Sequence, residues 1–309
     1  MKDKVSLIIP CYNEEEALPF LYRELKKVAD DISEITIEYI FIDDGSEDQT
    51  ISAIKEFSMA DNRVFYISFS RNFGKEAAIY AGLKKATGDF VALIDADLQD
   101  PPSLLKDMYA LIKTGDYDCV ATCRTDRKGD PVIRSFFSRL FYRAINKMSE
   151  IKLVDGARDF RLMTRAMVDA ILKITENNRF SKGIFEWVGF KTKWLPFQNT
   201  VRVAGKTKWS FIQLFLYSIE GVLAFSTLPL YLASAFGILF CLISFVYILV
   251  IIVKTLIWGE PVQGYSSTIC IVFFIGGIQL LCIGILGLYL SKAYIETKKR
   301  PIFIIKEER

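Results

Sequence analysis

Two aspartates, Asp95 and Asp97, follow directly after a short apolar segment, Phe90–Ile94. That segment comes after a Gly-Asp turn and is followed by acids and two prolines, which is typical of a buried strand that ends abruptly in a loop. Side chains at positions i and i+2 of a strand point to the same side, so both carboxylates can face one ligand. Converging carboxylates are costly without a cation between them, and their oxygens suit Mg²⁺ or Mn²⁺, ions that commonly hold substrate phosphates.

An isolated Asp-x-Asp sequence more often marks a solvated acidic turn than a metal site. The surrounding elements favour the metal site here, because apolar strands alternate with helices along the chain. The predicted strands are Val5–Pro10, Ile35–Ile42, Val64–Phe69 and Phe90–Ile94. This alternation predicts an α/β fold with a mainly parallel sheet and helices on both faces, in which ligands bind at the carboxyl ends of the strands. No loop has the glycine spacing of a Walker or dinucleotide-binding motif.

The amino-acid composition excludes several kinds of catalytic and metal site. The 309 residues contain no histidine. Ser-His-Asp and Cys-His catalysis are therefore excluded, and any metal must be held by carboxylates and the substrate. The six cysteines show no disulfide-framework spacing, and the net charge of +3 is too small to indicate a nucleic-acid partner.

Arginines follow a fifth predicted strand, Tyr117–Thr122, in the region 124–143. They form either the solvated face of a helix or a site for a second anionic group, since guanidinium groups bind phosphates well. Further on, Arg158, Asp159 and Arg161 alternate with apolar residues, as in a half-buried edge strand. We expect these arginines to lower the pKa of Asp159 and keep it ionised, although a plain structural ion pair would show the same pattern.

The composition changes near residue 209. Few charges occur in 209–228, which predicts an amphipathic helix at a membrane interface. Two uncharged segments follow, Pro229–Val253 and Thr268–Leu290, each long enough to cross the roughly 30 Å hydrocarbon core of a bilayer. Glycines in the second segment permit close helix packing and hence a homo-oligomer.

Basic residues orient these segments in the membrane. Six lysines and arginines lie in 291–309, whereas the loop between the two segments has one Lys and one Glu. The positive-inside rule therefore puts the carboxyl end in the cytoplasm, and the first strand is too short for a signal peptide. The predicted organisation is a cytoplasmic catalytic domain (1–208), an interfacial helix (209–228), two transmembrane helices with a short outer loop (229–290) and a cytoplasmic basic tail (291–309).

Three segments resemble the family 2 glycosyltransferases, which have a GT-A fold: Val5–Glu14, Ile42–Ser46 and Asp95–Pro101. Arg71–Lys75 and the two apolar segments are more narrowly similar to the polyprenyl-phosphate glycosyltransferases, the group of dolichyl-phosphate mannose synthase and the bactoprenol glucosyltransferases. The resemblance covers nearly the whole chain. It implies inverting transfer of one sugar from a nucleotide-diphosphate sugar, first of all UDP-glucose, to undecaprenyl or another polyprenyl phosphate. The reaction would take place at the cytoplasmic face of the bacterial plasma membrane.

The resemblance also implies roles for individual residues. The donor nucleotide is expected to contact Pro10, Tyr12, Asn13, Glu14, Asp44, Asp95 and Lys208. The residues expected to hold Mg²⁺ or Mn²⁺ are Asp95, Asp97 and Gln99. Those expected at the acceptor phosphate are Arg124, Arg134 and Ser138. Those expected to act in catalysis are Asp159, Asp97 and Arg202, with Arg202 and Lys208 closing over the diphosphate.

The sequence leaves other functions open. GDP-mannose, UDP-N-acetylglucosamine and aminoarabinose donors occur in similar enzymes. A processive polysaccharide synthase is a further alternative, although its Gln-x-x-Arg-Trp motif is absent and Arg202–Trp209 stands in that region. A non-catalytic sugar-nucleotide-binding protein and a transporter are other classes, and uncharged spans give little basis for the transporter.

Because a phosphate acceptor is largely ionised at neutral pH, Asp159 is expected to orient neighbouring groups rather than remove a proton.

Overall fold

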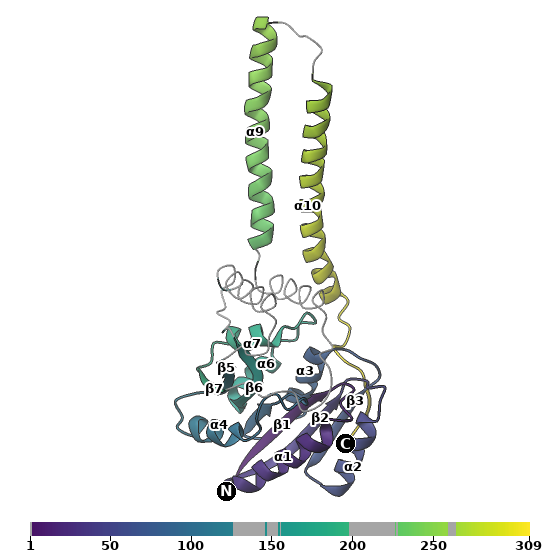
Figure 1. Ribbon diagram of the computed structural model, residues 1–309, viewed down its shortest axis with the longest axis vertical. Coiled ribbons are helices and arrows are strands. Elements are labelled where there is room, and N and C mark those ends of the chain that lie inside the picture. Colours follow the sequence, from purple (N-terminus) through teal and green to yellow (C-terminus); the bar gives the residue numbers. More distant parts are fainter. Residues whose placement is uncertain are drawn as a thin grey trace. The chain divides into compact units, whose positions relative to one another are not determined.

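The structure is a computed structural model (Figure 1), and its described residues are 2–125, 146, 154, 156–197, 226, 228–258 and 264–309. The chain divides into two compact units. The first comprises Met1–Ala224 together with Arg300–Arg309, and the second comprises Phe225–Lys299. The carboxyl-terminal residues thus belong to the first unit, although the helix before them belongs to the second.

The first unit is built on an eight-stranded sheet with the order β7-β5-β6-β4-β1-β2-β3-β8. Its strands are β1 (Asp3–Cys11), β2 (Ile35–Asp43), β3 (Val64–Phe69), β4 (Phe90–Leu93), β5 (Cys119–Arg124), β6 (Ala157–Thr164), β7 (Thr192–Phe197) and β8 (Ile305–Glu308). The pairs β1–β2, β1–β4, β2–β3 and β5–β7 are parallel, which confirms the predicted mainly parallel α/β sheet. Strand β6 runs antiparallel between β4 and β5, so the expectation that it lies at an edge is wrong.

Helices pack on both faces of the central strands. The helices of this unit are α1 (Leu18–Asp31), α2 (Thr50–Ala60), α3 (Lys75–Lys85), α4 (Leu104–Ile112), α6 (Arg165–Leu172) and α7 (Ser181–Trp187). In α1, Leu18, Leu21 and Leu25 are buried because residues three and four apart share one face. The middle of β1 is buried on both faces, as expected for a parallel strand covered by helices on either side.

Strand register brings the polar strand ends together. Leu93 on β4 pairs with Arg161 on β6. Continuing that register by two residues on each strand places Asp95 level with Asp159. The parallel pair β1–β2 ends with Cys11 opposite Asp43, at the same edge of the sheet, because parallel strands share their carboxyl ends. The fold therefore gathers the predicted donor-site segments at one edge.

The carboxyl-terminal strand β8 covers the other edge of the sheet, where it pairs antiparallel with β3. Phe303 stacks on Phe69 with ring centroids 5.0 Å apart, and Lys55 pairs with Glu307 at 2.7 Å. The sequence Ile-Lys-Glu-Glu has little strand propensity of its own, which is why it was expected only as a basic tail. Unpaired backbone groups on β3 provide the partner that the local sequence lacks.

Replacing Phe303 by alanine is expected to lower the free energy of unfolding by about 2 kcal/mol, because a half-buried aromatic contact is lost. The thermal midpoint of the purified protein in detergent should then fall by several degrees. The neighbouring substitution Ile304→Ala removes a side chain that is 51% exposed and should change the midpoint little. Equal shifts for both variants would contradict a specific role for the Phe303–Phe69 contact.

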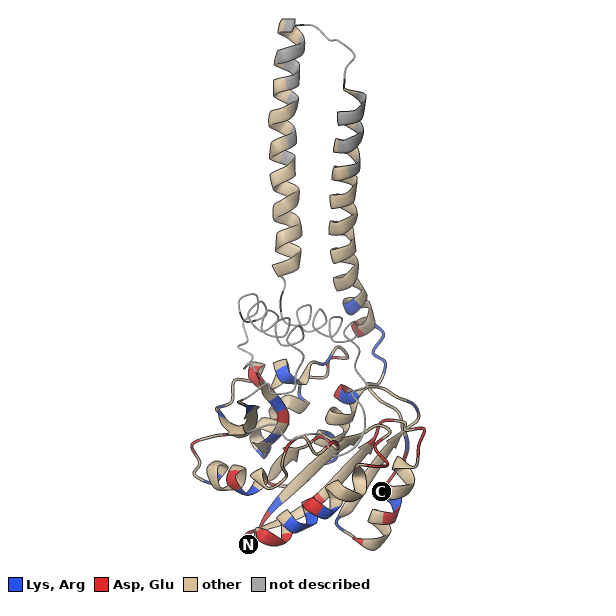
Figure 2. Cartoon of the chain, viewed as in Figure 1, with Lys and Arg blue, Asp and Glu red and all other residues tan. Residues whose placement is uncertain are grey.

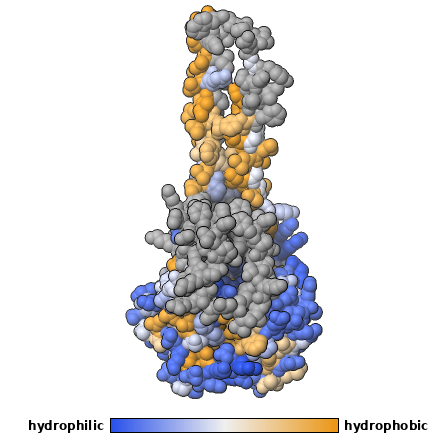
Figure 3. Space-filling view, viewed as in Figure 1, coloured by the Kyte–Doolittle hydropathy of each residue, from blue (hydrophilic) through white to orange (hydrophobic). Residues whose placement is uncertain are grey.

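The second unit is a pair of long helices, α9 (Leu228–Trp258) and α10 (Tyr265–Thr297). Both are long and apolar enough to cross a membrane. The described residues of Leu228–Tyr247 and Tyr265–Ser291 include no charged side chain (Figure 2), and their visible surface is mainly apolar (Figure 3). These helices contain both predicted spans, and the predicted interfacial helix lies largely outside the described residues.

The two helices are antiparallel and contact each other at the described residues that follow. Phe240 and Phe274 make an edge-to-face contact at 5.5 Å, and the Cys282 thiol lies 3.7 Å from the carbonyl of Ala233. The glycines of α10, including Gly276 and Gly284, face open space, so they take no part in this contact. Self-association through those glycines stays a prediction.

Candidate active site

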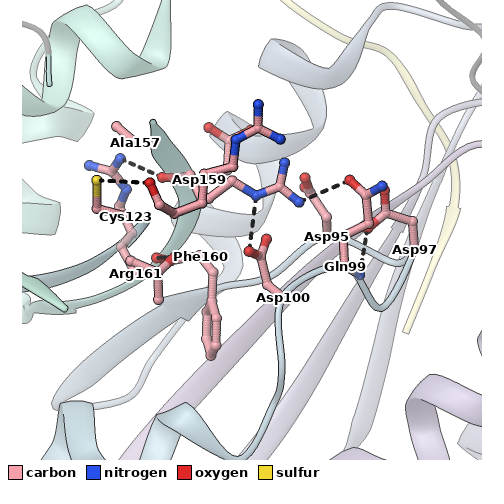
Figure 4. A network of polar contacts seen from close by, with 12 residues as sticks. Asp95, Asp97, Gln99, Asp100, Cys123, Ala157, Asp159, Phe160 and Arg161 are labelled. Carbon is pink, nitrogen blue, oxygen red and sulfur yellow. Dashed lines mark hydrogen bonds and ion pairs between the residues drawn. The ribbon is translucent and has the colours of Figure 1, made fainter. Parts of the chain in front are cut away.

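Acidic residues from two strands meet at the carboxyl edge of β4 (Figure 4). Asp95 and Asp97 lie in the loop that follows β4, and Asp159 lies near the start of β6. The β4–β6 register explains this proximity, because antiparallel pairing brings the end of one strand beside the beginning of the other. Like charges so close together require a counter-ion.

Lys75 supplies that counter-ion. Its Nζ lies 2.6 Å from Asp95 Oδ1 and 2.5 Å from Asp159 Oδ2. Lys182 lies farther away, with Nζ 3.9 Å from Asp159 Oδ1, and donates a hydrogen bond to the carbonyl of Ala157 at 3.3 Å. Each lysine begins or nearly begins a helix, α3 and α7 respectively. Two helix starts thus deliver two ammonium groups to one carboxylate.

These lysines determine the ionisation of Asp159. Burial alone would raise the pKa of Asp159, but Lys75 and Lys182 outweigh burial and hold that pKa well below its usual range. The same ion pairs raise the pKa of Lys75 against the effect of its own burial. The predicted direction for Asp159 is confirmed. A carboxylate held this firmly in its ionised form is a poor proton acceptor.

Of the two arginines expected beside Asp159, Arg161 contributes to lowering its pKa, whereas Arg158 turns elsewhere. Arg158 donates to Asp100 Oδ1 at 3.0 Å and to Gln99 Oε1 at 2.9 Å. Adjacent residues of a strand point to opposite faces, so Arg158 cannot share the direction of Asp159. Arg161 is buried, with its guanidinium carbon 3.8 Å from the ring centre of Phe185.

The oxygens around Asp97 suit a hard divalent ion. Asp97 Oδ1 accepts the backbone amide of Gln99 at 3.1 Å, which shapes the turn that also carries Asp95. Among the described residues no three acidic, cysteine or histidine side chains form a ready-made metal cage. Mg²⁺ typically takes one or two protein carboxylates and completes its shell with water and substrate phosphates. The donor set therefore fits Mg²⁺ or Mn²⁺ shared with a diphosphate, whereas the Gln99 amide oxygen is already engaged by Arg158.

The loops after β1 and β2 hold each other in place. Asn13 has a positive φ of 53°, donates its backbone amide to Ser46 Oγ at 3.0 Å, and accepts the amide of Glu47 on its side-chain oxygen at 2.8 Å. The amide of Glu14 donates to Thr50 Oγ1 at 2.8 Å. Asn tolerates the left-handed conformation better than most residues. Pro10, Tyr12, Asn13 and Glu14 are all partly exposed at this edge, where a nucleotide was expected.

Asp44 stabilises the turn that precedes α3. Its carboxylate accepts the amides of Phe73 at 2.7 Å and Gly74 at 3.0 Å, in the turn that leads into Lys75. Burial raises the pKa of Asp44 to about 6, although these amides favour the ionised form. Gly45 next to it has a φ of 67°, and a Cβ there would lie 2.4 Å from the carbonyl carbon of Arg71. Asp44 therefore fixes the start of α3, and its contact with a base or ribose stays a prediction.

The remaining predicted residues fall into two groups. Arg124 ends β5, where its backbone amide donates to the carbonyl of Gly156 at 3.0 Å. The others lie outside the described residues: Arg134, Ser138, Arg202 and Lys208. Their roles at the acceptor phosphate and the diphosphate stay predictions.

Sequence reasoning assigned no site role to three residues that shape the site, namely Lys75, Glu76 and Lys182. Glu76 accepts the amide of Ser181 at 2.8 Å, and also its hydroxyl, so it joins the starts of α3 and α7. The one available signal was the position of Lys75 directly after Gly74 at a helix start. Nothing local in the sequence indicated that α7 would lie beside α3.

Replacing Arg158 by leucine is expected to lower the free energy of unfolding by about 3 kcal/mol, because Asp100 is only 1% exposed and would lose its counter-ion. Burial already raises the pKa of Asp100 to about 6 with Arg158 present. Without Arg158 the pKa of Asp100 should rise further, so the variant should be most stable in acid and lose stability as pH increases. Chemical denaturation at pH 5 and pH 8 measures this. Lys27→Ala, which breaks an exposed pair with Glu24, should cost under about 1 kcal/mol at either pH.

Similar known proteins indicate the family of this chain. The family model described as Glycosyl transferase family 2 matches residues 6–172. A "Putative glycosyltransferase CsbB" of Bacillus subtilis is 47% identical over 98% of this chain and 91% of its own length. The "Prophage bactoprenol glucosyl transferase homolog" of Escherichia coli is 41% identical over 98% of both chains. The "Bactoprenol glucosyl transferase" of Shigella phage SfX is 40% identical over 99% of this chain and 100% of its own.

Among solved structures, glucosyl-3-phosphoglycerate synthase from Mycobacterium tuberculosis, with Mn²⁺, UDP-glucose and phosphoglyceric acid, is similar with a TM-score of 0.47. Its sequence is 18% identical, over 72% of this chain and 78% of that one. The family match and the full-length relatives together define the class of protein. The chain belongs to glycosyl transferase family 2, and it is a glycosyltransferase.

Proposed function

We propose that the protein transfers one sugar, glucose from UDP-glucose in first place, to the phosphate of undecaprenyl or another polyprenyl phosphate, with inversion at the anomeric carbon. The observation that carries the proposal is the acidic cluster at the carboxyl edge of β4, where Asp95 and Asp159 share Lys75 beside Asp97. The lipid acceptor and the glucose are suggested by relatives named bactoprenol glucosyl transferase, which match this chain along its whole length. The assay described below decides whether the donor is UDP-glucose, GDP-mannose or another sugar nucleotide.

Different residues would bind the metal ion and the nucleotide. Asp95 and Asp97 would hold Mg²⁺ or Mn²⁺. Gln99 would join them if its amide oxygen were released by Arg158. When bound, the ion offsets negative charge on the departing diphosphate. The loop residues Tyr12 and Asn13 would bind the nucleotide.

The acceptor phosphate has its second pKa near 6, so it is already a nucleophile at neutral pH and needs no strong base. Asp159 would therefore orient Lys75 and Lys182 rather than remove a proton.

The helices α9 and α10 would anchor the protein in the bacterial plasma membrane as a two-span protein. Their length and apolar surface are the observations that support this arrangement. The catalytic domain would face the cytoplasm, where nucleotide sugars are made, and Arg124, Arg134 and Ser138 would receive the lipid phosphate. A membrane-anchored enzyme is suited to an acceptor that cannot leave the bilayer.

The test is release of nucleoside diphosphate by the purified protein in detergent, with Mg²⁺ or Mn²⁺. Each sugar nucleotide of a panel is assayed with and without undecaprenyl phosphate. Release that depends on both lipid and metal, from UDP-glucose alone, is the expected result, and EDTA should abolish it. Lipid-dependent release from a different donor would correct the sugar. A product carrying several sugars would favour a processive synthase, and nucleotide binding without turnover would favour a binding protein.

A further inference from the structure

Lys75 lies between two carboxylates of the candidate active site. Its ammonium lies 2.6 Å from Asp95, in the loop after β4, and 2.5 Å from Asp159, on β6. Among the described residues, Lys75 is the one cation within ion-pair distance of Asp95. The lysine thus already supplies the positive charge that two converging carboxylates require.

The backbone at Lys75 is held by its neighbours, whereas part of its side chain is exposed. Asp44 accepts the amides of Phe73 and Gly74 immediately before it, and Glu76 immediately after it is bound to the start of α7. The side chain of Lys75 itself is 39% exposed. A lysine ends in a compact charge on a flexible four-carbon stem, so its ammonium can leave one carboxylate without moving the helix.

We propose that Lys75 is an internal counter-ion that competes with the divalent metal for Asp95 and keeps the metal site weak until the sugar nucleotide arrives. With a metal on Asp95, the ammonium of Lys75 would keep its ion pair with Asp159 alone. The nucleotide's diphosphate supplies the additional ligands and negative charge that favour this exchange. Metal and donor would consequently bind together, and the free enzyme would hold little metal.

This inference rests on the proposed function in one respect, namely that Asp95 is a metal ligand. Lys182 provides a matched control, since its ammonium contacts Asp159 at 3.9 Å and belongs to no ion pair with Asp95. Removing Lys182 therefore takes away the same charge from the same cluster without freeing Asp95. A second variant, Lys75→Arg, keeps the charge and tests whether competition or side-chain shape is responsible.

The experiment is a Mn²⁺ titration of the full-length protein in detergent without nucleotide, followed by the electron paramagnetic resonance signal of free Mn²⁺. Lys75→Met should bind Mn²⁺ at least ten-fold more tightly than the wild type. Lys182→Met and Lys75→Arg should stay within about three-fold of it. If Lys75→Met does not fold, as judged by circular dichroism, Lys75→Gln replaces it with the same expectation.

Three outcomes would overturn the inference: unchanged or weaker Mn²⁺ binding in folded Lys75→Met or Lys75→Gln, equal tightening in Lys182→Met, or equal tightening in Lys75→Arg. The second would show a general electrostatic effect rather than competition at Asp95. Failure of the proposed function gives a different result, because the wild type would then show no lipid-dependent turnover. If the wild type shows lipid-dependent turnover but binds Mn²⁺ as tightly as Lys75→Met, the counter-ion role of Lys75 is contradicted while the proposed function stands.

Discussion

Replacing Asp97 by asparagine is expected to reduce lipid-dependent release of nucleoside diphosphate at least a thousand-fold. Asp97 lies in the turn after β4 beside Asp95, where carboxylate oxygens would hold the ion that neutralises the leaving diphosphate. A loss of about 4 kcal/mol of transition-state stabilisation corresponds to roughly a thousand-fold in rate. Asparagine retains an oxygen that can accept the Gln99 amide, so the turn should persist while the charge is lost.

The control for this prediction is Asp107→Asn, which removes an exposed carboxylate from the first turn of α4. Its rate should stay within about two-fold of the wild type. Mn²⁺ binding measured in the presence of nucleotide should weaken in Asp97→Asn and not in Asp107→Asn. If Asp97→Asn kept more than a tenth of wild-type turnover, Asp97 would not be an essential metal ligand.

Replacing Asp159 by asparagine is the second large effect, with an expected loss of at least a hundred-fold in kcat. Asp159 is joined to Lys75 and lies near Lys182, so the neutral amide would leave two ammonium groups without their shared carboxylate. Their positions at the carboxyl edge of β4 would then be lost. Asp169→Asn, which changes an exposed carboxylate on α6, serves as the control and should have little effect.

The pH dependence separates an orienting role from a proton-accepting role. The pKa of Asp159 is held well below its usual range, so its titration lies below the working pH. The wild-type rate should instead rise as pH increases through about 6, where the acceptor phosphate loses its second proton. Asp159→Asn should keep that rise at a lower overall rate. Disappearance of the rise in the variant would assign the proton-accepting role to Asp159.

The sequence by itself determined the elements that carry the site. Short apolar strands followed by polar loops are local patterns, and they predicted β1 to β4 and the acids at their ends. The two long uncharged segments likewise predicted α9 and α10, because spanning length and composition are local properties. The segments Val5–Glu14, Ile42–Ser46 and Asp95–Pro101 together indicated the glycosyltransferase class, since each is a run of consecutive residues.

The tertiary structure alone decided which residues act on one another. Lys75 meets Asp159 across 84 positions of sequence, because α3 begins beside the antiparallel strand β6. Arg158, next to Asp159 in the chain, pairs with Asp100, and Arg161, two positions after Asp159, packs on the ring of Phe185. Strand β8 formed because the edge of β3 offered unpaired backbone groups, not because its own residues favour strands. Local patterns fix strands and helices, whereas charge pairing depends on which of them the folded sheet brings together.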